Sequence, residues 1–207
     1  KALEKLDSIR VKNLLSLVGF DKVKLENNKI VKVNDRVYFD FNAIAKGYAV
    51  DVAGRFLETK GISNYIVEIG GELRARGLNQ VKREPWKVGV ERPNFDGTRS
   101  IEKTIEIHDE SMATSGNYRK FKIDSISGKK YAHIINSKTG YPAQSKLLSV
   151  SVIANLDCAD VDAFATALMA MPLKKAKSFL ENRKQLKAII IFSDDNGELQ
   201  TFTSSNF

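Results

Sequence analysis

The sequence has only one cysteine, Cys158, among its 207 residues. A single thiol excludes an internal disulfide and any zinc site built from several thiolates. The sequence also lacks an apolar run long enough to span a bilayer, and we find no signal-peptide pattern in it. It opens on Lys1 rather than Met, so a processed or truncated product that has lost an anchor is one interpretation.

Basic residues outnumber acidic ones and give a formal charge of +8, but the lysines are scattered along the chain with acidic residues among them. This distribution lacks the basic stripe of a nucleic-acid-binding protein, and we expect no nucleic-acid partner. A bound anionic small molecule and a solvated basic surface explain the charge equally well. With 43% hydrophobic and 28% charged residues, the composition is that of a soluble globular protein. We expect one domain spanning residues 1–207, with a division into two lobes as the alternative.

Short apolar runs separated by turn residues outnumber the segments with helical spacing. The pattern therefore predicts an α+β fold, with helices packed on a largely antiparallel β-sheet. The predicted helices cover residues 8–18, 45–60, 157–171 and 173–182; the predicted strands and hairpins cover residues 23–33, 65–69, 73–78, 86–90, 101–107, 131–135, 148–154 and 188–202.

Residues 40–51, DFNAIAKGYAVD, follow the apolar, β-prone residues 37–39 and lead into helical spacing, which predicts a strand, a tight loop and a helix start. A junction of this kind presents free backbone N–H groups and the positive end of a helix, which favours phosphate. Lys46 would add a positive charge there. On this stretch alone an ordinary connection with a solvated lysine is the better interpretation, because no full phosphate-binding signature is present.

Two further segments have both a functional and a structural interpretation. Gly70 and Gly71 interrupt a strand pattern, which indicates a bulge, a close approach of the backbone to a ligand, or a simple kink between strands. Thr114 and Ser115 precede Gly116 in a short polar segment, where their hydroxyls could bind a phosphate or, more commonly, stabilise a turn.

The predicted helix after Asp157 carries Asp162 and Thr166 four residues apart, hence on one face. A carboxylate and a hydroxyl in this arrangement are hard oxygen ligands suited to Mg²⁺, although an aspartate near a helix start is more often there for the helix dipole. Asp157 and Asp160 are expected to cap this helix. His133 lies in an apolar strand, where a hydrogen-bonded structural histidine is the default interpretation.

Taken together and in order, the segments DFNAIAKGYAVD, YIVEIGGELRARG, MATSGNYR, YAHIINSKTGYP and CADVDAFATALM resemble the ApbE family, the FAD:protein FMN transferases. The resemblance extends from about Asp7 to the C-terminus, without the N-terminal part of the family fold, roughly a third of its usual length. It implies a Mg²⁺-dependent reaction in which the FMN half of FAD is joined to a threonine hydroxyl of an acceptor protein and AMP leaves.

The resemblance also implies a setting for this reaction. Family acceptors are flavin-carrying subunits of membrane redox complexes, and most members are exported lipoproteins on the outer, periplasmic side of the cytoplasmic membrane. We therefore expect membrane association through an anchor that is not present in this chain.

Carried over to this sequence, the resemblance assigns the metal to the Ala45 carbonyl and the side chains of Asp162 and Thr166, with Ala165 at a further metal-site position where it offers only its carbonyl. His133 matches the histidine associated with transfer. The residues that match FAD-contacting or nucleotide-proximal positions are Asn42, Lys46, Tyr48, Gly70, Gly71, Thr114, Ser115, Gly116 and Ile135.

Two departures from the family pattern bear on activity. The usual HIIDP ends here in Asn136 and Ser137, which removes a carboxylate and a turn proline, and Asn42 and Ala43 replace smaller, glycine-like residues. Two alternatives to transfer stay open. No feature of the sequence excludes hydrolysis of FAD to FMN and AMP at the same site, and the missing N-terminal part of the family fold favours FAD binding without catalysis.

Overall fold

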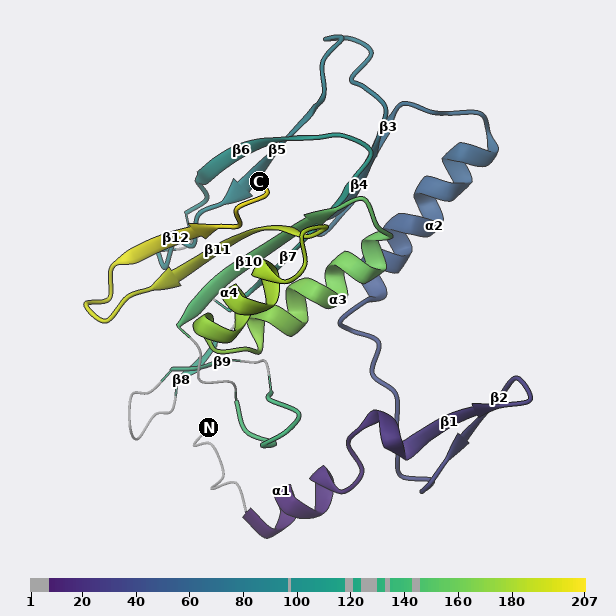
Figure 1. Ribbon diagram of the computed structural model, residues 1–207, viewed down its shortest axis with the longest axis vertical. Coiled ribbons are helices and arrows are strands. Elements are labelled where there is room, and N and C mark those ends of the chain that lie inside the picture. The colour runs from purple at the N-terminus through teal and green to yellow at the C-terminus, as the bar shows by residue number, and fades with distance from the viewer. Residues whose placement is uncertain (1–7, 97, 118–120, 124–129, 133–134, 143–145) are drawn as a thin grey trace. The chain divides into compact units, whose positions relative to one another are not determined.

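The computed structural model describes residues 8–96, 98–117, 121–123, 130–132, 135–142 and 146–207 (Figure 1). The chain divides into two compact units, which are described separately. Unit 1 comprises residues 1–40 and 121–144, and unit 2 comprises residues 41–120 and 145–207. None of the helices in the described ranges is both long and apolar enough to cross a lipid bilayer.

Unit 1 contains short elements. Helix α1 (Ser8–Leu15) and the 3₁₀ turn η1 (Phe20–Lys22) precede a hairpin of β1 (Val23–Glu26) and β2 (Lys29–Lys32). Asn27 and Asn28 form its two-residue turn with φ of 49° and 59°, which confirms the predicted polar-turn hairpin. Strands β8 (Phe121–Ile123) and β9 (Lys130–Ala132) pair antiparallel.

Unit 2 is built on a six-stranded sheet in the order β12-β11-β10-β7-β4-β3, in which every neighbouring pair is antiparallel (Figure 1). Its strands are β3 (Tyr65–Ile69), β4 (Glu72–Arg76), β7 (Ser111–Gly116), β10 (Leu147–Ala154), β11 (Lys187–Ser193) and β12 (Leu199–Thr203). Helices α2 (Ala45–Thr59) and α3 (Cys158–Met169) pack on this sheet and on each other, and α4 (Leu173–Glu181) follows α3. The predicted α+β class with an antiparallel sheet is confirmed.

The other face of the sheet packs against the hairpin of β5 (Trp86–Glu91) and β6 (Ile101–Ile107). The core between them is a cluster of apolar side chains from both layers, namely Leu73, Ala75, Val90, Ile105, Ile107, Met112, Ile153, Ile189 and Ile191. Because strand side chains alternate, Leu73 and Ala75 of β4 face this core while Glu72 and Arg74 face the helices. Two charged residues are thus buried beneath α2.

Of the two interpretations of the polar segment around Thr114, the turn is wrong. The segment is strand β7, in the middle of the sheet between β10 and β4. Its hydroxyls have partners there: Thr114 Oγ1 lies 2.8 Å from Ser151 Oγ, and Ser111 Oγ donates to the Leu156 carbonyl at 2.8 Å. Since buried hydroxyls cost little once they are hydrogen-bonded, a strand of small polar residues is stable at the sheet centre.

Candidate functional site

The first turn of α2 lies against the β3–β4 hairpin. The strand predicted over residues 37–39 does not form, because residues 37–41 have no regular secondary structure. Residues 42–44 form the predicted turn, and Ile44 occupies the N-cap position of α2 without a side-chain cap bond. Lys46, in that first turn, places its Nζ 2.5 Å from Glu72 Oε2 at the start of β4. Lys46 is about half exposed, whereas Glu72 is 1% exposed. The Lys46 charge is therefore held at the helix start by a buried carboxylate.

Gly70 and Gly71 make the two-residue turn between β3 and β4, with φ of 63° and 107°. Positive φ at both positions favours glycine, so the pair is a tight hairpin turn rather than a bulge. A Cβ at Gly70 would meet the Lys46 side chain at 3.5 Å. The lysine therefore lies across this turn on its way to Glu72.

Helix α3 meets α2 at Gly47. The Gly47 amide donates to Asp162 Oδ2 at 3.2 Å, and Asp162 is 3% exposed. A Cβ at position 47 would lie 2.4 Å from the Cys158 carbonyl oxygen, so glycine permits the close approach of the two helices. Thr166, one turn beyond Asp162, has its Oγ1 3.1 Å from Ser115 Oγ on β7. Asp162 is thereby fixed at the N-terminus of α2.

Lys46 is the cation that acts on both buried carboxylates of this junction. Burial raises the pKa of the Glu72 carboxyl; the Lys46 ammonium opposes this effect and the charge of Asp162 reinforces it. Burial also raises the pKa of Asp162, against the opposing Gly47 amide and Lys46. Lys46 thus balances two buried carboxylates, and Glu72 Oε2 has the Lys46 ion pair but no well-directed hydrogen bond among the described residues.

These observations fit a bound cation, because additional positive charge would stabilise both carboxylates. Asp162, Thr166 and a helix-start carbonyl offer the hard oxygen ligands that Mg²⁺ prefers. Within the described ranges no group of three or more His, Cys, Asp or Glu side chains is arranged around a metal position. A site here would need backbone carbonyl and ligand oxygens in addition to the side chains.

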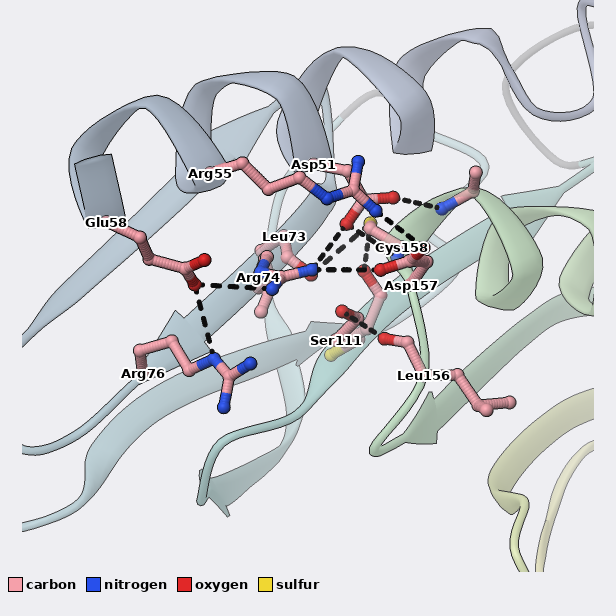
Figure 2. Close-up of polar contacts among 12 residues, drawn as sticks. Asp51, Arg55, Glu58, Leu73, Arg74, Arg76, Ser111, Leu156, Asp157 and Cys158 are labelled. Carbon is pink, nitrogen blue, oxygen red and sulfur yellow. Dashed lines mark hydrogen bonds and ion pairs between the residues drawn. The ribbon is translucent and has the colours of Figure 1, made fainter. Parts of the chain in front are cut away.

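A second polar cluster is centred on Arg74 (Figure 2). Its Nη1 lies 2.9 Å from Asp51 Oδ1 on α2 and 3.1 Å from Asp157 Oδ1 before α3. Its remaining nitrogens contact Tyr65 and Glu58. Burial lowers the pKa of Arg74, but the bonds to Tyr65 and Asp51 outweigh it and raise the pKa overall, so the guanidinium stays charged.

The predicted caps of α3 are not the ones that the structure uses. Asp157 is its N-cap residue, yet its side chain bonds Arg55 and Arg74 and makes no cap bond. The free amides of Cys158 and Ala159 instead donate to Asp51 Oδ1 and Oδ2, each at 2.9 Å. The cap is supplied from α2, because Asp157 is drawn away by two arginines.

Comparison with known proteins identifies the family to which this chain belongs. Residues 2–190 match the ApbE family. The chain belongs to the ApbE family. It is 37% identical to the FAD:protein FMN transferase of Vibrio cholerae over 193 residues, which cover 93% of this chain and 55% of the relative, and 39% identical to that of Haemophilus influenzae, with 92% and 54% covered.

Solved structures agree with this assignment. The flavin transferase ApbE from Vibrio cholerae superposes with a TM-score of 0.84 at 33% identity, covering 100% of this chain and 64% of that structure. The ApbE protein from Thermotoga maritima gives 0.81 at 28% identity, with 99% and 64% covered. The chain spans about half the length of the curated relatives that it matches.

Several site residues predicted from the ApbE resemblance come together in unit 2. Ala45 begins α2, Lys46 follows it, and Asp162 accepts from the next residue, Gly47. Thr166, one turn beyond Asp162 on α3, contacts Ser115 of β7. Gly70 lies under the Lys46 side chain.

Other predicted residues make none of these contacts. Tyr48 is 60% exposed on α2, and Thr114 faces Ser151 rather than α3. Ala165 is fully buried within α3, where a carbonyl normally accepts from the amide four residues on. Ile135 belongs to unit 1, where it forms an isolated bridge with Pro142.

Four further predicted residues complete the set. Asn42 lies in the turn before α2, Gly71 in the β3–β4 turn, and Gly116 at the end of β7. His133 lies outside the described residues. The binding, metal and catalytic roles of all these residues stay predictions.

Sequence reasoning missed Glu72, Asp51 and Arg74. All three lie in segments that carry the ApbE resemblance. Glu72 directly follows the paired glycines, and Asp51 ends the segment DFNAIAKGYAVD. The available signal was a charged residue alternating with apolar ones in ELRAR, which places Glu72 and Arg74 on one face of a strand.

Proposed function

We propose that the chain carries the catalytic site of an FAD:protein FMN transferase that uses Mg²⁺ and attaches FMN to a threonine hydroxyl of an acceptor protein. The observation that carries this proposal is family membership over residues 2–190, with relatives named for that activity. The α2–α3 junction supports it, because a helix start, a lysine, a buried carboxylate and partly buried hydroxyl oxygens suit a pyrophosphate with a divalent cation.

In the proposed reaction, the threonine oxygen attacks the phosphorus on the FMN side of the pyrophosphate. The bond from that phosphorus to the bridging oxygen breaks, and AMP leaves with this oxygen. A phosphoester joins FMN to the threonine. Such a transfer depends mainly on alignment of the reacting groups and on neutralisation of the phosphate oxygens.

The residues of this chain divide these tasks. Asp162, Thr166 and the Ala45 carbonyl would hold Mg²⁺, with Ala165 as a further carbonyl donor, and the cation would supply charge neutralisation at the pyrophosphate. Lys46 and the amides of the α2 start would bind phosphate oxygens. His133 would take the proton of the threonine hydroxyl or give one to the leaving AMP.

The setting is also proposed. We infer that the acceptor is a flavin-carrying subunit of a membrane redox complex and that the intact protein works outside the cytoplasmic membrane, anchored by lipid. Fractionation of cells that produce the intact protein, followed by detection in membrane and soluble fractions, tests this inference.

Incubation of the chain with FAD, Mg²⁺ and a candidate acceptor subunit tests the reaction. Mass spectrometry of the acceptor should find FMN on a threonine, and the nucleotide fraction should contain AMP. Free FMN and AMP without an adduct would identify a hydrolase instead. Unchanged FAD, with binding shown by flavin fluorescence, would identify a binding protein and refute the catalytic proposal.

A further inference from the structure

Helices α2 and α3 cap each other. The α2 start has no cap from its own N-cap residue, Ile44, and its Gly47 amide donates to Asp162 of α3. The α3 start has no cap bond from Asp157, and its first amides donate to Asp51 of α2. Each helix therefore supplies a carboxylate that accepts from the other's first turn, from one amide at the α2 start and from two at the α3 start.

We propose that Asp51 is a positioning residue, which holds Asp162 and Thr166 in place against the first turn of α2. The chemical consequence rests on the proposed function, since these are the groups assigned to Mg²⁺. The contacts between the helices stand independently of it.

The spacing of the two caps is what makes Asp51 effective. Asp51 lies four residues after Gly47, and Asp162 lies four residues after Cys158, so the contacts are one turn apart on each helix. A single contact leaves two helices free to rotate about it. Two contacts one turn apart fix both their rotation and their relative shift along the axis.

Burial distinguishes Asp51 from Asp157, whose ion pair with Arg55 also connects the two helices. Asp51 is 1% exposed and accepts from Cys158, Ala159 and Arg74, all at 2.9 Å (Figure 2). The Asp157–Arg55 ion pair is close, at 2.6 Å, but both side chains are nearly half exposed. Exposed pairs contribute little, whereas a buried, fully bonded carboxylate is held in one geometry.

Arg74 makes this buried carboxylate possible. Arg74 is 7% exposed and provides the counter-charge to Asp51. It lies on β4, two residues after Glu72, which pairs with Lys46. Strand β4 is therefore tied to α2 at Lys46 and again at Asp51. Strand β4 thus provides the partner of Lys46 and also the partner of Asp51, which caps α3.

Amide hydrogen exchange tests the coupling without reference to catalysis. Asp51→Asn keeps the shape, but its NH₂ group places a donor opposite the Cys158 or Ala159 amide or Arg74. We expect exchange at Gly47, whose amide bonds Asp162 and not Asp51, to become about tenfold faster or more through local opening of the junction. Arg55→Gln, which removes the exposed link between the same helices, should leave Gly47 exchange unchanged.

Mg²⁺ titration tests the consequence for the site. With Asp51→Asn, we expect the Mg²⁺ concentration for half-maximal FAD turnover and the calorimetric Kd for Mg²⁺ in the presence of FAD both to rise about 10- to 100-fold, as when residues that orient metal ligands are removed. Val90→Ala is the control for general destabilisation, because Val90 is buried in the core on the opposite face of the sheet. Its Mg²⁺ constants should equal those of the wild type.

The two measurements separate failure of this inference from failure of the proposed function. Unchanged Gly47 exchange in Asp51→Asn overturns the positioning role, whatever the activity. Equal shifts of the Mg²⁺ constants in Val90→Ala and Asp51→Asn overturn it as well. Faster Gly47 exchange in a protein whose wild type neither binds Mg²⁺ nor turns over FAD would support the coupling and refute the proposed function.

Discussion

Gly47→Ala should destabilise the protein, although alanine is the better helix former. A Cβ at this position would lie 2.4 Å from the Cys158 carbonyl oxygen, 2.6 Å from its carbon and 2.7 Å from the Ala159 nitrogen. All three are backbone atoms, so no side-chain rotation relieves the overlap. The two helices must separate by about 1 Å to restore an ordinary contact.

This separation also breaks the junction. The Gly47–Asp162 hydrogen bond is already 3.2 Å long and would be lost. Overpacking costs about 1–3 kcal/mol and an unsatisfied buried group about 1–3 kcal/mol, while the alanine propensity returns about 1 kcal/mol. We expect a net loss of about 1–5 kcal/mol in the free energy of unfolding, with about 3 kcal/mol as the central value.

Urea unfolding followed by circular dichroism measures the effect, and the midpoint should fall by roughly 1 M or more. Ala49→Gly, at an exposed position of the same helix, calibrates the difference between the two residues and should cost about 1 kcal/mol. Were the close approach of the helices wrong, Gly47→Ala would raise the stability by that same amount. A variant as stable as the wild type, or more stable, would falsify the proposed helix contact.

The remaining predictions concern the charged groups of the site. Glu72→Gln should become more stable relative to the wild type as pH rises. The Glu72 pKa is raised in the folded state, so the wild type loses stability between the ordinary and the raised pKa, whereas the glutamine does not titrate. Urea midpoints of the two proteins that run parallel from about pH 4 to pH 8 would contradict this. Asp162→Ala should abolish Mg²⁺-dependent FAD turnover, measured as FMN release, and a near-normal rate would remove Asp162 from the metal assignment. His133→Ala should lose FMN transfer while flavin fluorescence still shows FAD binding; loss of binding alone would make the residue structural.

Local patterns were enough to predict most elements of this fold. Periodicity and turn residues predict the start of α2 after residues 42–44 and the β11–β12 hairpin. They also predict the glycine with positive φ, Gly61, that follows the end of α2. Strand β7 was missed because serine and threonine are typical of turns when read locally. Its hydroxyls contact Ser151 of the neighbouring strand β10 and Thr166 of the helix α3, and both partners lie far away in sequence.

The site divides in the same way. Asp162 and Thr166 could be paired from their spacing, because a helix of known period fixes which residues share a face. No spacing connects Gly47 with Asp162, 115 residues apart, or Asp51 with Cys158, 107 residues apart. Aspartate near a helix start predicts a cap for its own helix, whereas here the nearby aspartate is drawn to arginines and the cap comes from the neighbouring helix.

The cross-capping also gives a physical reason for the combination of small and acidic residues at this junction. Two helix starts that approach each other bring together free N–H groups and two positive dipole ends, which repel. Asp51 and Asp162 satisfy the amides and offset both dipoles, while Gly47 permits the approach. Burial of both carboxylates requires cations in turn; Arg74 meets that need at Asp51, whereas Asp162 has the partly exposed Lys46, shared with Glu72. Among the described residues, Asp162 is therefore the less compensated of the two capping carboxylates, and it is the one that we propose as a Mg²⁺ ligand.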